Sequence, residues 1–120
     1  MRKGGDKMAK LNGKGFKVVK RLVNPHSGLS IAIRSDGIIL RKTFNGWKRY
    51  KRLKKEVTPE QAIKHLVNEG GYIEGVAPEF NTLLKWQNEG IARTPDGCRV
   101  EPDGTCQHGY KSWLLIYGLL

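Results

Sequence analysis

Three residues near the end of the chain have side chains suited to metal binding. They are Cys98, Cys106 and His108, with the spacing C-x7-C-x-H. Thiolate and imidazole groups are common zinc ligands, and a closed tetrahedral site needs four ligands. His26 is the candidate for the fourth ligand, provided that its loop lies near. A pair of buried structural thiols is the simpler interpretation, and a zinc site or a redox pair are the alternatives.

The chain offers few arrangements for catalysis. No Gly-rich phosphate loop follows a predicted strand, and Glu101 and Asp103 stand in a turn context. Cys106 and His108 are too close along an extended chain to face each other. His65 is expected to be an exposed helical residue. The sequence therefore predicts a protein that is not an enzyme.

The second chemical feature of the chain is segregated positive charge. Residues 1–55 contain 17 Lys and Arg residues but only two acidic residues, whereas the rest contains 5 Lys and Arg residues and nine acidic residues. A charge distribution of this kind attracts polyanions, of which nucleic acid is the commonest in a cell. It predicts nucleic-acid binding by the first half of the chain.

Four predicted strands position these cations, over residues 16–23, 29–35, 38–44 and 47–54. Asp36-Gly37 and Asn45-Gly46 are typical of two-residue type I′ hairpin turns. Such turns would pair Ile33 with Leu40, and Leu40 with Lys51. One face of the sheet then collects Leu29, Ile31, Ile33, Ile38, Leu40, Phe44, Trp47 and Leu53, and the opposite face collects Ala32, Arg34, Ile39, Arg41, Thr43, Lys48, Tyr50, Arg52 and Lys54.

This register has one exception, because three cations fall on the apolar face. They are Lys42, Arg49 and Lys51, with Lys42 directly opposite Arg49. Facing like charges destabilise a sheet, so these long side chains are expected to extend past the edge of the core.

Helices are expected to cover the apolar face. Thr58-Pro59-Glu60-Gln61 predicts a capped helix start and Gly70-Gly71 predicts its end. A second helix is predicted over residues 78–89, and Ser112 is expected to cap a last apolar helix over residues 113–120. The predicted fold is α+β, a four-stranded antiparallel β-meander with helices packed on one face and a basic opposite face.

The chain divides into three regions by composition. Residues 1–15 are expected to form a flexible basic arm, residues 16–90 the nucleic-acid-binding domain, and residues 91–120 a Cys/His turn region whose apolar helix packs on the domain or on a partner. The chain has no long apolar segment and no secretory signal, so we expect a cytoplasmic protein without membrane contact.

Residues 29–70 resemble the single-stranded-DNA-binding fold of the positive-cofactor-four transcriptional coactivators, on the pattern of basic strands followed by Thr58-Pro59-Glu60-Gln61. That resemblance implies a sheet that binds melted nucleic acid and a homodimer supported by the helix. The same residues also resemble the three-stranded domain of plant-type transcription factors and phage integrase arms, which binds the duplex major groove.

The tail has a resemblance of its own. Asp96-Gly97-Cys98, Val100 to Gly104, Cys106, His108-Gly109 and Ser112-Trp113-Leu114 are similar to the ending of a group of short bacterial proteins, including proteins of photosynthetic species. That resemblance implies no function.

Three hypotheses follow from the sequence. The first is a binder of single-stranded DNA or RNA, the second a duplex major-groove binder, and the third a protein-interaction module for an acidic partner, using the tail helix and the Cys/His turn. The residues expected to contact nucleic acid are Arg34, Arg41, Trp47, Lys48, Arg49, Tyr50, Lys51, Arg52 and Lys54.

Overall fold

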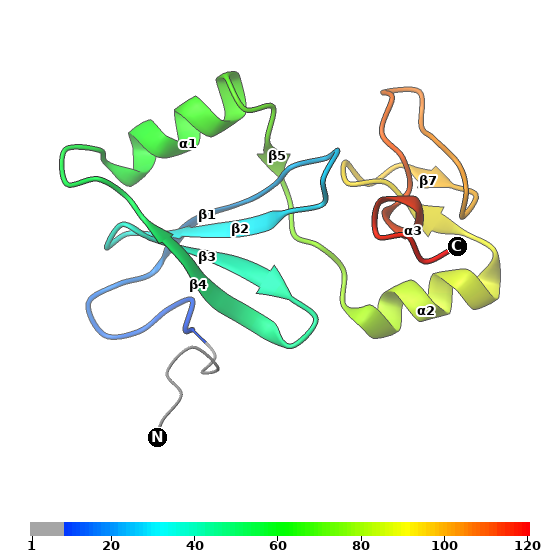
Figure 1. Cartoon of the computed structure of the whole chain (residues 1–120), viewed down its shortest axis with the longest axis horizontal. Coiled ribbons are helices and arrows are strands. Elements are labelled where there is room, and N and C mark those ends of the chain that lie inside the picture. The colour runs from blue at the N-terminus through cyan, green and yellow to red at the C-terminus, as the bar shows by residue number, and fades with distance from the viewer. Residues whose placement is uncertain (1–8) are drawn as a thin grey trace.

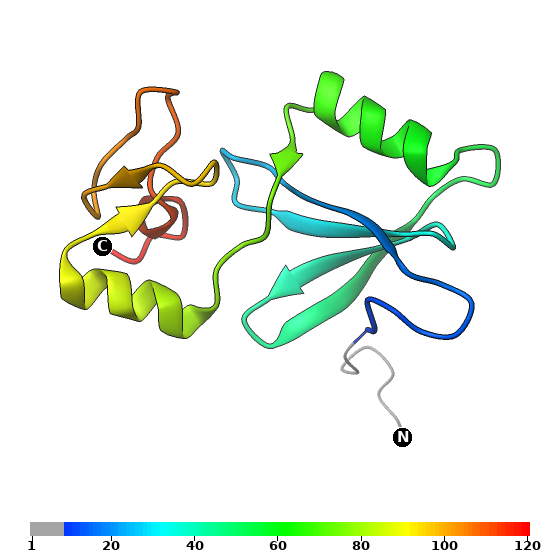
Figure 2. The same ribbon diagram turned by 180° about the vertical axis from the view of Figure 1, so that it is seen from behind.

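The computed structural model describes residues 9–120, which form a sheet with one helix and a smaller C-terminal part (Figures 1 and 2). The sheet contains β1 (Val18–Val23), β2 (Ser30–Arg34), β3 (Ile38–Thr43), β4 (Gly46–Arg52) and β5 (Ile73–Glu74), in the order β4-β3-β2-β1-β5. All its pairings are antiparallel. The predicted α+β class is confirmed, but the sheet has a fifth strand that the sequence did not reveal.

Both hairpin turns differ from the predicted type. A type I′ turn needs positive φ at both central residues. Here only the glycines adopt it, with φ of 86° at Gly37 and 109° at Gly46, while Asp36 and Asn45 do not. In the first hairpin the amide of Gly37 donates to the carbonyl of Arg34 over 3.0 Å, which leaves three residues in the loop instead of two.

This longer loop moves the strand register by one residue. Ile33 pairs with Ile39 rather than with Leu40. The second hairpin has its own offset of two residues near the turn, because Leu40 pairs with Arg49 rather than with Lys51. An irregularity between Ile39 and Leu40 then reduces this offset to one residue, and Ile39 pairs with Lys51. Because a one-residue shift exchanges the two faces of a strand, the predicted separation into one apolar and one basic face is wrong.

The first face of the sheet packs against α1 (Pro59–Asn68). Leu22, Ile31, Ile33 and Ile39 are buried there, with Ile63 and Leu66 of α1 packed over them. The helix begins as predicted: Thr58 accepts from the amide of Gln61, and Gln61 accepts from the amide of Thr58. Figure 1 shows α1 lying along one side of the sheet.

The opposite face is also apolar, and the segment that enters β1 covers it. Ala32, Ile38 and Leu40 are buried there, with Ala9, Leu11, Val18 and Trp47 packed against them. The amide of Ala9 donates to the carbonyl of Trp47 over 2.9 Å. Residues 1–8 of the predicted arm lie outside the described residues, whereas residues 9–15 are not a free arm.

The C-terminal part consists of α2 (Phe80–Glu89), β6 (Ala92–Arg93), β7 (Arg99–Val100) and α3 (Trp113–Ile116). Helix α2 packs on α3 and β6, so the prediction that it covers the sheet is wrong. Leu83, Trp113 and Leu114 are buried together. The last helix is capped by Ser112 as predicted, but it ends at Ile116 because Gly118 takes positive φ.

A short linker joins the two parts by contacts to the sheet. The amide of Ala77 donates to the Ser30 hydroxyl over 3.1 Å, and its carbonyl accepts from Lys42 Nζ over 2.7 Å. Val23, the last residue of β1, is buried with Leu83 and Leu114 of the C-terminal part. The two parts therefore share one continuous set of contacts.

Within residues 9–120, every helix is too short or too polar to cross a membrane.

The second apolar face can be tested with a matched pair of Leu→Ala variants. Leu40 is 0% exposed and Leu120 is 61% exposed. Loss of a buried leucine costs about 2–5 kcal/mol. We expect Leu40→Ala to lower the free energy of unfolding by that amount in urea, and Leu120→Ala to change it by less than about 0.5 kcal/mol. Equal effects of the two substitutions would show that Leu40 is not covered.

Candidate functional site

Four potential metal ligands meet in the C-terminal part. They are Asp96, Cys98, Cys106 and His108, and one donor atom from each lies within 4.8 Å of all the others. The sequence predicted three of them. All four come from two short turns whose backbone conformations are fixed locally.

The first turn connects β6 to β7 and supplies Asp96 and Cys98. Thr94 fixes its shape, because the Thr94 amide donates to the Cys98 carbonyl over 2.9 Å and the Cys98 amide donates to the Thr94 hydroxyl over 3.0 Å. Gly97 between them has a φ of 92°, which favours glycine. Thr94 is buried, so its hydrogen bonds anchor this turn to the interior of the C-terminal part.

The second turn supplies Cys106 and His108. The Cys106 amide donates to the carbonyl of Tyr110 over 2.9 Å, and the amide of Gly109 donates to the Cys106 carbonyl over the same distance. The chain is therefore not extended here, and the turn brings Cys106 Sγ to 3.7 Å from His108 Nδ1. The prediction that these two side chains could not face each other is wrong.

The separations of the donor atoms suit a small tetrahedral ion. His108 Nδ1 lies 3.4 Å from Cys98 Sγ, 3.7 Å from Cys106 Sγ and 2.8 Å from Asp96 Oδ2. The two sulfur atoms lie 3.7 and 3.8 Å from oxygens of Asp96. With metal–ligand bonds of about 2.0–2.3 Å, the ligands of a tetrahedral zinc ion are about 3.3–3.8 Å apart. The sulfur–nitrogen and sulfur–oxygen separations lie in this range, whereas Asp96 Oδ2 is in direct hydrogen-bond contact with His108 Nδ1 and would move outward by about 0.5 Å to share an ion with it. With that small displacement the four residues fit such an ion.

His108 contacts Cys98, Cys106 and Asp96 through the same ring nitrogen. Both thiols and the carboxylate lie next to Nδ1. In a catalytic Cys–His–Asp relay, one ring nitrogen meets the thiol and the other meets the carboxylate. Convergence on one nitrogen is instead the geometry of ligands that share one ion.

The surroundings favour the anionic forms of two ligands. Partial desolvation opposes the charge on Asp96, but hydrogen bonds from Thr94 and the charge of His108 hold the pKa of this carboxyl below its ordinary value. Desolvation likewise opposes the Cys106 thiolate. Hydrogen bonds with the backbone of Tyr110 and with His108 outweigh this effect and lower the pKa of the thiol below its ordinary value.

The other two ligands have raised pKa values. Contacts with Cys106 and Asp96 raise the pKa of His108. Desolvation and its neighbours Cys106 and Asp96 raise the pKa of the Cys98 thiol. A cation at the centre would offset the repulsion that the Cys98 thiolate meets from Cys106 and Asp96.

His26 lies outside this group of four. Its ring lies 5.7 Å from that of Tyr110 in an edge-to-face arrangement, and the fourth member of the group is Asp96. A signal in the sequence could have identified Asp96, because D-x-C and C-x-H each place two donors one residue apart beside a glycine turn.

The residues expected to bind nucleic acid are divided between the two faces of the sheet. Arg41, Lys48 and Lys51 pair across strands on the face covered by α1, whereas Arg34, Trp47, Arg49 and Arg52 lie on the opposite face. All of them except Arg34 lie on β3, on β4 or just after β4, which forms one edge of the sheet. Arg41, Arg49, Tyr50, Lys51, Arg52 and Lys54 are exposed.

Two of the expected contact residues are occupied within the chain. Arg34 bonds both carboxylate oxygens of Asp36, over 3.0 and 2.6 Å, donates to the Lys10 carbonyl, and lies 3.9 Å from the centre of the Phe16 ring. Trp47 packs on the buried cluster around Leu40. Tyr50 stays exposed, with Lys51 Nζ 5.0 Å from its ring centre.

The binding of Arg34 to Asp36 predicts a pH dependence. The guanidinium lowers the pKa of Asp36 below its ordinary value of 3.8, so this pair stabilises the fold above that value and the stabilisation is lost as the pH falls through the lowered pKa. We expect Arg34→Gln to raise the pKa of Asp36 toward 3.8. An NMR titration of the carboxyl carbon measures this, with the exposed Arg52→Gln as control. An unchanged Asp36 titration in Arg34→Gln would contradict the assignment.

Comparison with known proteins gives no family model, no curated protein and no solved structure that matches the chain. The chemistry of the site is therefore derived from its own residues: four converging donor atoms in the C-terminal part and a row of exposed cations along the sheet edge.

Proposed function

We propose that this protein binds one zinc ion through Asp96, Cys98, Cys106 and His108. The observation that carries this proposal is the approach of four donor atoms to within 4.8 Å of one another. Two thiolates, one imidazole and one carboxylate are all ligand types that zinc takes. Four protein ligands fill the tetrahedral positions, which is typical of a structural site rather than a catalytic one.

The ion would join two separate turns of the C-terminal part. One turn lies between β6 and β7, and the other precedes Ser112, which caps α3. A structural zinc ion contributes its binding free energy to folding, because the unfolded chain does not hold the ligands together. Zinc therefore stabilises the C-terminal part, and its role is not catalysis.

Zinc binding can be measured directly on the full chain. We expect one zinc ion per chain by elemental analysis, and a loss of stability when a chelator removes it. At a free zinc concentration 100 times the dissociation constant, bound zinc stabilises the fold by about 2.7 kcal/mol. Asp96→Asn should weaken zinc affinity at least about tenfold, as measured by competition with a chromogenic chelator.

Matched controls separate loss of a ligand from a general effect. Asp103→Asn makes the same change as Asp96→Asn at another Asp-Gly sequence. His65→Ala is likewise the control for the test variant His108→Ala. Neither Asp103 nor His65 belongs to the group of four, so both controls should keep full affinity. Chain that binds no zinc when its thiols are reduced would refute the proposal.

A second candidate function is nucleic-acid binding along β4. The observation in its favour is that Arg49, Lys51, Arg52, Lys54 and Lys55 are exposed on or just after an edge strand. Among the described residues none of these five takes part in an ion pair. Residues 37–55 contain no Asp or Glu. Phosphates neutralised by such cations release condensed counterions, which favours binding.

The cations lie along an edge rather than across a face. Arg49 and Arg52 point to one side of β4 and Lys51 to the other, so a phosphate backbone following the strand meets cations from both sides. Charged residues on an edge strand also prevent sheets from pairing edge to edge. A role in nucleic-acid binding and a purely protective role predict different results in solution.

The edge proposal predicts a change in salt dependence. We expect the triple variant Arg49→Gln, Lys51→Gln, Arg52→Gln to lose affinity for a single-stranded oligonucleotide. Its slope of log affinity against log salt should fall by about 2, since each phosphate contact on a single strand contributes about 0.7. Fluorescence anisotropy at several salt concentrations measures the slope.

The control triple Lys64→Gln, Lys85→Gln, Arg99→Gln removes the same charge from exposed residues elsewhere. It should keep the slope of the wild type. Equal slopes for both triples would show that only net charge matters, and a gain of self-association in the first triple would favour the protective role. Parallel measurements on duplex DNA and on an acidic peptide separate the remaining hypotheses.

A further inference from the structure

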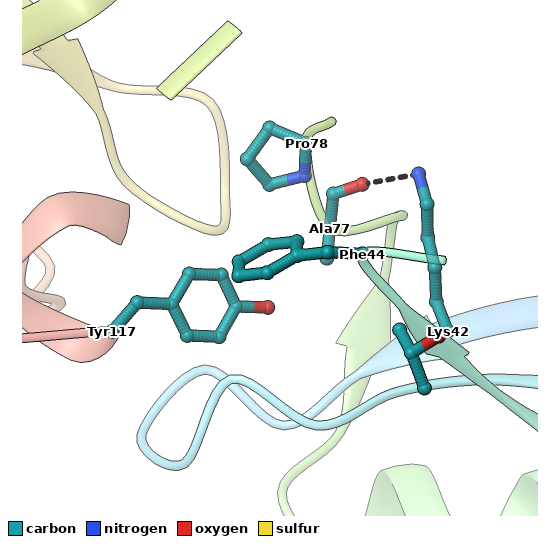
Figure 3. Close-up of a pocket in the computed structure, with 6 residues that line it drawn as sticks. Lys42, Phe44, Ala77, Pro78 and Tyr117 are labelled. Atoms are coloured by element: carbon teal, nitrogen blue, oxygen red, sulfur yellow. Dashed lines mark hydrogen bonds between the residues drawn. The ribbon is translucent and has the colours of Figure 1, made fainter. Parts of the chain in front are cut away.

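A cavity of about 290 Å³ lies where the β3–β4 hairpin meets the C-terminal part. Lys42, Thr43, Phe44, Ala77, Pro78 and Tyr117 line it. Figure 3 shows Phe44 and Tyr117 close together on one side and Lys42 reaching the Ala77 carbonyl on the other. The volume is at the small end of the range for ligand pockets, which suits one compact planar group.

The walls of the cavity offer aromatic surface. The Phe44 ring centre lies 5.1 Å from that of Phe80 and 5.7 Å from that of Tyr117, at interplanar angles of 56° and 82°. Neither contact is a parallel stack, and Phe44 remains 51% exposed although it is a large apolar residue. An exposed aromatic ring beside a cavity is a surface on which another flat ring can stack.

The polar groups of the cavity are fixed and carry little net charge. The Lys42 side chain is 11% exposed, and its ammonium group bonds the Ala77 carbonyl over 2.7 Å and the Glu79 carboxylate over 2.5 Å. The Tyr117 hydroxyl donates to the Gly28 carbonyl over 2.9 Å, and burial raises the pKa of Tyr117 to about 12, so it stays neutral. A neutral ring with hydrogen-bonding edges fits this cavity better than a phosphate does.

The position of the cavity relative to the cations identifies the class of ligand. Lys42 pairs with Trp47 on the side of the sheet to which Arg49 and Arg52 point. A polyanion that follows these two arginines therefore reaches the hairpin tip, where Phe44 is located. Nucleic acid is the polyanion that carries flat neutral rings on its charged backbone, and an unpaired base stacks readily on aromatic side chains.

We propose that the cavity lined by Lys42, Phe44 and Tyr117 receives an unpaired base of single-stranded nucleic acid whose backbone follows β4. This proposal rests on the second candidate function. Phosphates meet the cations of the edge strand, and one base leaves the stack to contact Phe44. Paired bases cannot enter, so the cavity gives the protein a preference for single strands.

The test compares two conservative variants with the wild type. Phe44→Leu keeps an apolar side chain but removes the aromatic face, and Tyr110→Leu makes a similar change at a part-exposed aromatic of the C-terminal part, away from β4 and outside the cavity. We expect Phe44→Leu to lower affinity for a twelve-nucleotide thymidine oligomer about tenfold, and Tyr110→Leu to leave it within about twofold. Affinity for a duplex of the same length should not change with Phe44→Leu.

Each other outcome overturns a defined part of the proposal. Single-strand affinity that survives Phe44→Leu refutes the base cavity while leaving edge binding intact, and a wild type that binds no oligonucleotide refutes both. If light scattering shows a wild-type dimer that Phe44→Leu separates, the cavity is instead a contact between two copies of the chain. Unfolding curves of both variants confirm that each is folded.

Discussion

The conformation of two hairpin loops decides how this chain folds. Asp36 and Asn45 keep negative φ, so neither Asx-Gly pair forms the predicted type I′ turn, and the loop at Asp36-Gly37 is one residue longer than predicted. The resulting register gives both faces of the sheet an apolar centre, with Ile33 on one and Leu40 on the other. Two coverings are then needed, and α1 provides one while residues 9–18 provide the other.

The same register determines where the charge can go. With both faces covered at their centres, exposed cations are left along β4, the edge strand. The cation on β2, Arg34, is instead bound to Asp36 and to the N-terminal segment, where it helps to hold that segment on the sheet. Part of the positive charge of the first half therefore stabilises the fold. The cations that stay exposed to a partner lie in a row along β4 rather than across a face of the sheet.

Local signals in the sequence were reliable, whereas signals that depend on register were not. The cap at Thr58, the cap at Ser112 and the end of α2 at Gly90 were predictable because each needs only neighbouring residues. Strand pairing across Asp36-Gly37 depends on one dihedral angle that composition does not determine. Three of the four clustered donors were predicted, but the fourth was expected to be His26 and is Asp96.

The contacts of the linker at Ala77 limit how this architecture could be altered. Ala77 is hydrogen-bonded through both backbone groups to side chains of β2 and β3, and Val23 lies in the apolar cluster of the other part. A chain cut between the two parts would expose Val23 and leave the Ser30 hydroxyl and Lys42 ammonium without these partners. The two parts are therefore not interchangeable modules. A recombinant protein that joined either part to an unrelated domain would need new contacts in place of those made by Ala77 and Val23.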